Sequence, residues 1–147
     1  MTNLKLAQAN AIIDAALAEG RKRQFAPLAV AVLDAGGHLI SFQREDGAGF
    51  ARFDIAYGKA WGALGMGFGT RELLERAARY PAFVATISTA TQGGIIPSPG
   101  GVLILAEDHE VIGGVGISGD SGDNDEICAL AGIQAAGFFA RPGATKD

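Results

Sequence analysis

The stretch that most constrains the fold is residues 111–128, a glycine-rich apolar run that ends in an acidic helix start. It contains the pattern GxGxxG at Gly114, Gly116 and Gly119, which is typical of dinucleotide-binding turns. In such turns the glycines follow the strand, and an acidic residue about 20 positions further on binds the ribose. Here two of the glycines lie inside the apolar run, and the distal position falls on Gln134. The pattern therefore favours a glycine-rich strand over a dinucleotide site.

A strand with so little side-chain bulk lets another backbone or a flat ligand approach closely. Residues 118–122 then turn into a helix, where Asp123 and Glu126 have the spacing of a capping box and Asp125 adds charge that the helix dipole favours. Helix capping therefore accounts for most of this acidity. A divalent cation held by Asp120, Asp123 and Asp125 is the alternative, although the spacing differs from that of an EF-hand.

Composition and charge narrow the class of protein. The 147 residues suit a single domain over residues 1–147, and 48% hydrophobic residues with a mean hydropathy of +0.21 predict extra surface buried between subunits. We therefore expect a homo-oligomer. A net charge of −4 without a basic stripe argues against nucleic acid or an anionic membrane as a partner. The single cysteine, Cys128, excludes an internal disulfide framework, and we expect a cytoplasmic protein because no targeting segment is apparent.

Hydrophobic spacing predicts helices and strands in a mixed order. A first helix capped by Thr2 or Asn3 is followed by strands at 28–34 and 38–44, which form a hairpin around a Gly-Gly turn. The spacing turns helical again over 50–67, where three glycines on the helix imply close approach of another element.

The second half of the chain also contains both predicted helices and predicted strands. Thr70 caps a short helix that Pro81 stops, and residues 83–89 fit a further strand or an irregular segment. After an irregular loop at 92–101, strands at 102–106 and 111–117 form a second hairpin, and the last helix covers 124–140. This order predicts an α+β sandwich built on a mainly antiparallel sheet.

Several motifs follow one another along the chain, at residues 32–38 (VLDAGGH), 42–46 (FQRED), 59–60 (KA), 91–94 (TQGG), 99–101 (PGG), 111–119 (VIGGVGISG) and 125–126 (DE). In this order and spacing they resemble the GlcG/HbpS family, which includes haem-binding proteins and a domain appended to some corrinoid adenosyltransferases of the PduO type. The resemblance covers nearly the whole chain and implies a profilin-like α/β/α sandwich with an antiparallel sheet, and frequent homo-oligomers.

Histidine is the commonest axial ligand of haem, and the chain has two, His38 and His109, each at a predicted hairpin turn. His38 follows the Gly-Gly turn at a position where relatives also have a polar residue, so it is the candidate ligand. Without other support, a solvated turn histidine is the favoured interpretation for His38, and more strongly so for His109. No metal-ligand spacing or serine–histidine–carboxylate set is apparent, so no metal site is predicted.

A polar group between the first hairpin and the following apolar helix suggests what the ligand carries. Lys59 lies one residue from the apolar stripe of that helix, so it must either reach water or meet an anion. A haem propionate or another carboxylic acid is such an anion. We therefore predict a ligand-binding protein that holds haem or a carboxylated small molecule between the strand-to-helix turn, the glycine-proline loop and the polar group, with His38, Arg44, Gly94, Gly101 and Gly116 around the ligand.

Two other functions stay open. The chain could be a cytoplasmic enzyme of small-molecule catabolism, an isomerase, lyase or hydrolase, in which Glu126 or Asp125 is the base while Lys59 or Arg44 holds a carboxylate. It could also be a structural oligomer or partner-binding module, which would assemble without a saturable ligand.

Overall fold

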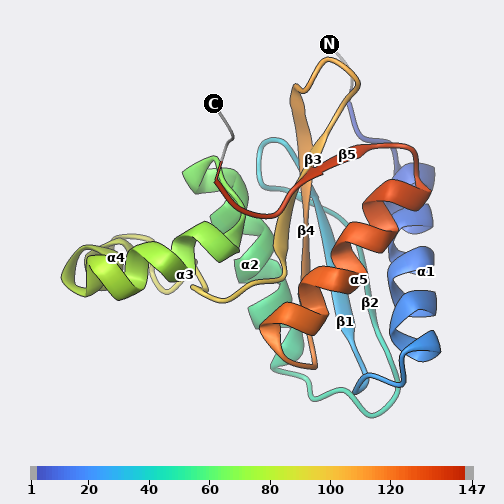
Figure 1. Ribbon diagram of the computed structural model, residues 1–147, viewed down its shortest axis with the longest axis horizontal. Coiled ribbons are helices and arrows are strands. Elements are labelled where there is room, and N and C mark those ends of the chain that lie inside the picture. Colours follow the sequence, from blue (N-terminus) through green and yellow to red (C-terminus); the bar gives the residue numbers. More distant parts are fainter. Residues whose placement is uncertain (1–2, 145–147) are drawn as a thin grey trace.

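The computed structural model describes residues 3–144 and shows a five-stranded sheet with helices on both faces (Figure 1). The strand order is β2-β1-β4-β3-β5, and every neighbouring pair is antiparallel. The predicted α+β sandwich with an antiparallel sheet is therefore confirmed. In chain order the elements are α1 (Leu6–Lys22), β1 (Ala29–Asp34), β2 (Leu39–Arg44), α2 (Arg52–Met66), α3 (Thr70–Arg79), α4 (Pro81–Ala90), β3 (Gly101–Leu105), β4 (Val111–Ser118), α5 (Gly122–Ala135) and β5 (Phe139–Arg141).

One face of the sheet carries the main hydrophobic core. Alternation along the strands places Val30 and Val32 of β1, with Val115 and Ile117 of β4, on the face that α1 and α5 cover. All four side chains are completely buried. Each such burial contributes about 1.5–3 kcal/mol relative to an exposed side chain, so this layer supplies much of the driving force for folding.

The opposite face carries a trough of small residues in which α2 lies. Ala31, Gly116 and Gly101 stand directly opposite one another on β1, β4 and β3, so the trough crosses three strands. Ala56 and Ala60 of α2 are buried against it. A Cβ atom on Gly116 would lie 2.8 Å from the Ala60 nitrogen and closer still to the Ala56 carbonyl oxygen. Helix-to-sheet packing therefore accounts for the glycine-rich strand.

The glycines of α2 are explained in part by the loop that precedes β3. A Cβ atom on Gly58 would lie 2.7 Å from the side chain of Ile96, and one on Gly62 would lie 3.3 Å from that of Ile95. The predicted close approach is confirmed for these two positions. It is wrong for Gly65, because nothing lies within 4 Å of the position of its missing Cβ.

Residues 81–90 form α4, so the expectation of a strand over 83–89 is wrong. Pro81 does not merely end α3, because it occupies the first turn of α4, where its missing N–H needs no partner. Thr70 is the first residue of α3 and does not cap it. Its hydroxyl instead accepts a hydrogen bond from the backbone N–H of Gly101 at 2.8 Å.

The boundaries of α1 and α5 also differ from the expected ones. Ser121 caps α5, since its Oγ accepts the N–H of Asn124, and Asp123 lies in the first helical turn. The helix ends at Ala135, and β5 follows as an edge strand paired with β3. Lys5 precedes the first residue of α1, so Asn3 does not cap it; Thr2 lies outside the described residues.

The hairpin of α3 and α4 projects from the rest of the molecule (Figure 1). It lies beyond the layer formed by α2, and α4 packs against α3. Within residues 3–144, no helix has both the length and the apolar character needed to cross a membrane.

Candidate functional site

Lys59 meets its anion within the protein. Its Nζ donates to the Ile117 carbonyl at 2.8 Å and to Oδ2 of Asp125 at 3.0 Å, and the two side chains are only 3% and 1% exposed. Burial lowers the pKa of Lys59 and raises that of Asp125, because loss of water outweighs their mutual attraction. The ion pair connects α2, on one face of the sheet, to α5 on the other.

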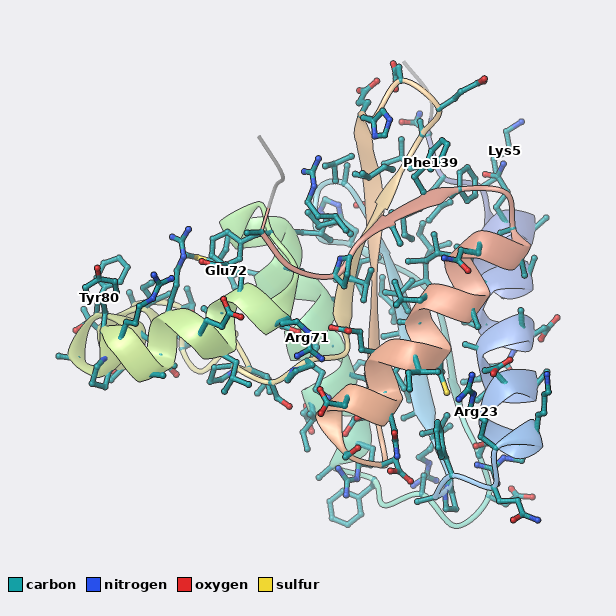
Figure 2. The ribbon with its side chains drawn as sticks, viewed as in Figure 1. Lys5, Arg23, Arg71, Glu72, Tyr80 and Phe139 are labelled. Atoms are coloured by element: carbon teal, nitrogen blue, oxygen red, sulfur yellow. The ribbon has the colours of Figure 1, made fainter. Side chains whose placement is uncertain are left out.

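A second ionic contact connects α3 to the start of α5. The Arg71 guanidinium donates to both carboxylate oxygens of Glu126, at 2.9 and 3.2 Å, and also to Asp123. Figure 2 shows Arg71 between α3 and the first turns of α5. These hydrogen bonds raise the pKa of Arg71 above its ordinary value. Arg71 has no signal as a site residue in the sequence, since no local spacing relates it to carboxylates more than fifty residues away.

The acidic residues at the start of α5 face separate partners in the protein. Asp120 accepts the backbone N–H of Ala26 at 2.8 Å, Asp123 meets Arg71, and Asp125 accepts from Lys59. Within residues 3–144, no three His, Cys, Asp or Glu side chains gather as a group that could hold a metal ion. The arrangement therefore gives these carboxylates structural partners. The catalytic roles of Asp125, Glu126 and Lys59 stay predictions.

The three glycines expected around a ligand are in contact with other parts of the chain. The Ala56 carbonyl lies against Gly116, and the Lys59 carbonyl with the Thr70 side chain lies against Gly101. A Cβ atom on Gly94 would lie 3.0 Å from the ring of Trp61. Packing alone therefore explains why these positions lack a side chain, and their part in ligand binding stays a prediction.

His38 lies at the mouth of a cavity at the β1–β2 turn. The cavity has a volume of about 400 Å³ and combines apolar and polar walls. The His38 side chain is 82% exposed, so its ring is accessible from solvent. The lining residues are Asn3, Leu4, Asp34, Ala35, Gly36, His38, Ile40 and Ile112.

Asp34 fixes the geometry of this turn. Its Oδ1 accepts the backbone N–H groups of Gly36 at 2.9 Å and of His38 at 3.0 Å, and lies 3.3 Å from Nδ1 of the His38 ring. Partial burial raises the pKa of Asp34, but the hydrogen bonds from His38 and Gly36 outweigh it and hold that pKa below its ordinary value. The carboxylate is therefore ionised at neutral pH. An ionised carboxylate beside Nδ1 favours the proton on that nitrogen and leaves Nε2 as a free electron-pair donor.

Arg44 lies at the other end of β2 from His38. Six residues of extended chain correspond to about 20 Å, and the two side chains line separate cavities. The cavity at Arg44 has a volume of about 440 Å³ and also includes Arg21, which forms an ion pair with Glu45 at 3.0 Å. The structure thus separates His38, Arg44 and Lys59, whereas the sequence predicts that they lie around one ligand.

Comparison with known proteins identifies the family. The family model described as haem degrading protein HbpS-like matches residues 4–134 of this chain. The chain belongs to the HbpS-like family. The resemblance that the sequence motifs indicated is therefore confirmed.

Solved structures of HbpS-like proteins share the fold. PduOC, crystallised in complex with haem, matches with a TM-score of 0.84 at 27% identity, covering 94% of this chain and 98% of that one. A double mutant of HbpS from Streptomyces reticuli matches with a TM-score of 0.80 at 32% identity, covering 93% and 89%. A 15.0 kDa protein of Citrobacter freundii, from the dhaT-dhaS intergenic region, is 31% identical over 103 residues, which are 70% of this chain and 71% of that protein.

Proposed function

We propose that this HbpS-like protein binds haem in the cavity at the β1–β2 turn, with His38 as the axial ligand. The observation that carries the proposal is the pairing of Asp34 with Nδ1 of an exposed His38, which leaves Nε2 free. Histidines that bind metals usually have such a second partner on the other ring nitrogen. The crystallised haem complex of PduOC, a relative with the same fold, supports haem as the ligand.

The other walls of the cavity suit a porphyrin. Leu4, Ile40 and Ile112 line the cavity beside His38, and a pocket that combines apolar walls with a few fixed polar groups is typical of cofactor sites. Asp34 would keep the imidazole ring oriented. Bound haem would supply an iron centre, whose chemistry the pocket polarity and the axial ligand set.

We further propose that the protein is a homo-oligomer. The support is its apolar composition together with exposed large side chains such as Tyr80 and Phe83, which are 59% and 57% exposed. Large apolar groups that gather on a surface are typical of interaction sites.

A hemin titration with matched histidine variants tests the haem proposal. His38→Asn removes the proposed ligand. His109→Asn is the control, because it removes the other histidine, which stacks on Phe139 with ring centroids 5.1 Å apart. Asn tolerates the positive φ of 66° at position 109. Absorbance in the Soret region reports both affinity and the identity of the ligand.

We expect wild type and His109→Asn to give the same Soret band, and His38→Asn to bind at least about tenfold more weakly with a shifted band. Added imidazole should restore the band position of His38→Asn, since it replaces the missing ring. Asp34→Asn should weaken binding by about 10-fold or more, the usual effect of removing a second partner. Wild-type binding by His38→Asn, or lost binding in His109→Asn alone, would overturn the proposal.

A further inference from the structure

The α3–α4 hairpin presents an apolar surface that the body of the molecule leaves open. Residues 80–106 contain no charged residue, although much of the segment up to residue 94 lies at the surface. Tyr80 lies towards the far end of the projecting hairpin in Figure 2, and Phe83 beside it in sequence is more than half exposed. Exposed segments of proteins normally carry charges, so this surface has the character of an interface.

The helix α4 has little to hold it in place. It has ten residues, and isolated helices of that length are marginal in water. Val84, Thr86, Ile87 and Thr89 are β-branched, which lowers helix propensity further. Val84 and Ile87 are the side chains that pack into the apolar cluster of the hairpin, so one side of α4 supports it and the other is bare. A partner on the bare side would supply the missing burial.

The bare side of α4 is complementary to itself. Its one large exposed side chain, Phe83, lies in the first half, and the other exposed residues are alanines, threonines and Pro81. If two helices lie antiparallel with a two-fold axis at Thr86, Phe83 of each copy faces Thr89 of the other, and Ala82 faces Ala90. The phenylalanine of each copy then packs on a threonine of the other, so the same contact forms twice, as an isologous interface requires. The exposed residues of α4 are Pro81, Ala82, Phe83, Ala85, Thr86, Thr89 and Ala90.

Charge supports the same arrangement. The last turn of α4 contains no basic residue, so its terminal carbonyls, the negative end of the helix dipole, lack a cation of their own. Arg76 and Arg79 line a hollow of about 470 Å³ with Tyr80 and Phe83, beside the start of α4. Antiparallel pairing brings the arginines of each copy to the last turn of α4 in the other copy.

We propose that the bare face of α4 binds a second copy of this chain, with the two α4 helices antiparallel across a two-fold axis near Thr86. The proposal rests on the homo-oligomer part of the proposed function, since it names the surface through which two chains associate. It does not depend on haem, because the residues of this face and those of the His38 cavity are different.

The mass of the assembly in solution gives the first test. Ala85→Arg places a charge at the centre of the face, while Ala11→Arg places the same side chain at an exposed position of α1 as a control. Both positions are exposed and helical, and Arg is a good helix former, so both variants should fold, which circular dichroism checks. We expect light scattering to give a multiple of 15.0 kDa for wild type and Ala11→Arg, and half that mass for Ala85→Arg.

The outcomes separate the two proposals. A 15.0 kDa monomer for wild type would overturn both the homo-oligomer and this interface. An oligomeric wild type whose mass Ala85→Arg leaves unchanged would overturn the α4 interface alone. Hemin titration of Ala85→Arg should give the wild-type Soret band, since the haem proposal concerns another part of the molecule.

A disulfide across the proposed axis gives a second test, which detects the interface by cross-linking and does not have to disrupt it. Thr86→Cys places two thiols next to each other only if the axis passes there, and Ala11→Cys is the control. The native Cys128 is completely buried, so it does not interfere. Under mild oxidation we expect disulfide-linked dimers of Thr86→Cys to form about tenfold faster or more, because the assembly raises the local thiol concentration. Equal rates for the two variants would contradict the axis.

Discussion

The packing of α2 in its trough predicts a large difference between two neighbouring glycines of β4. In Gly116→Ala the new methyl group would meet the Ala56 carbonyl oxygen and, at 2.8 Å, the Ala60 nitrogen, both of them backbone atoms of α2. Backbone atoms cannot rotate away, and ordinary contact needs about 3.5–4 Å. The closer contact, with the carbonyl oxygen, therefore requires the helix to move off the sheet by about 1.5–2 Å. Overpacking of this kind costs about 3 kcal/mol, which lowers the melting temperature by about 6–12 °C for a chain of this size.

Gly114→Ala is the matched control, because it lies on the same strand and points to the same face. Its methyl group would lie 3.1 Å from the side chain of Leu64, which can adjust, and 3.4 Å from the Ala60 carbonyl oxygen. Alanine also restricts the unfolded chain, which offsets part of the strain. We expect Gly114→Ala to stay within about 1 kcal/mol of wild type.

Guanidinium unfolding followed by circular dichroism measures both variants, and an unchanged slope confirms that only stability differs. Equal losses for Gly114→Ala and Gly116→Ala would refute the packing argument. A Gly116→Ala protein as stable as wild type that no longer binds hemin would show that this glycine serves the ligand.

Three further predictions concern buried and paired groups. Lys59→Met alone should destabilise the fold by about 3–5 kcal/mol, because it leaves the Asp125 charge unpaired. Adding Asp125→Leu should recover most of that loss, which a double-mutant cycle measured by urea unfolding would show. A double variant as unstable as Lys59→Met would contradict this view of the pair. For Asp120, hydrogen bonds from the backbone N–H of Ala26 and other groups lower the pKa below its ordinary 3.8, so its stabilisation is present above that pH and lost as the pH falls through the lower value. Thermal melts of wild type and Asp120→Asn should therefore differ at pH 7 and converge in acid; a gap independent of pH would count against the pairing. Burial raises the pKa of the Cys128 thiol to about 12, so it should react with a thiol reagent at pH 8 only in the unfolded protein, and rapid labelling of the native state would show that the residue is accessible.

Local patterns in the sequence are sufficient to predict most of the elements. The strands at 29–34 and 111–118 are continuous apolar runs, and burial on both faces of the sheet produces that pattern. The same reasoning fails for α4, since Val84, Thr86 and Ile87 favour a strand when taken alone. Pro81 at the first turn and packing against α3 decide for a helix instead. β5 has only three residues, and its pairing with β3 across the fold has no local signal.

The Lys59–Asp125 ion pair shows that a sequence can indicate one member of an ionic contact without identifying the other. A charge beside the apolar stripe of α2 indicated that Lys59 needs an anion, but the partner, Asp125, lies 66 residues away. Only the tertiary fold, with α2 and α5 on opposite faces of one sheet, brings them together. In this structure the anion beside Lys59 is the Asp125 side chain, and a contact of Lys59 with a haem propionate or substrate carboxylate stays a prediction.

These placements divide the molecule into a part that holds the fold together and a part whose side chains are free for binding. At the trough, the glycines, the Lys59–Asp125 pair and the Arg71 contacts already have partners within the chain, so a ligand there would have to displace them. The β1–β2 turn differs, because it presents a side chain that the fold leaves exposed. Asp34 fixes the turn through local hydrogen bonds, while the ring of His38 stays largely exposed and keeps Nε2 free. Because the core of the sheet does not depend on the His38 ring, a ligand could bind to the Nε2 electron pair at this rigid turn, or leave it, without disturbing the sheet.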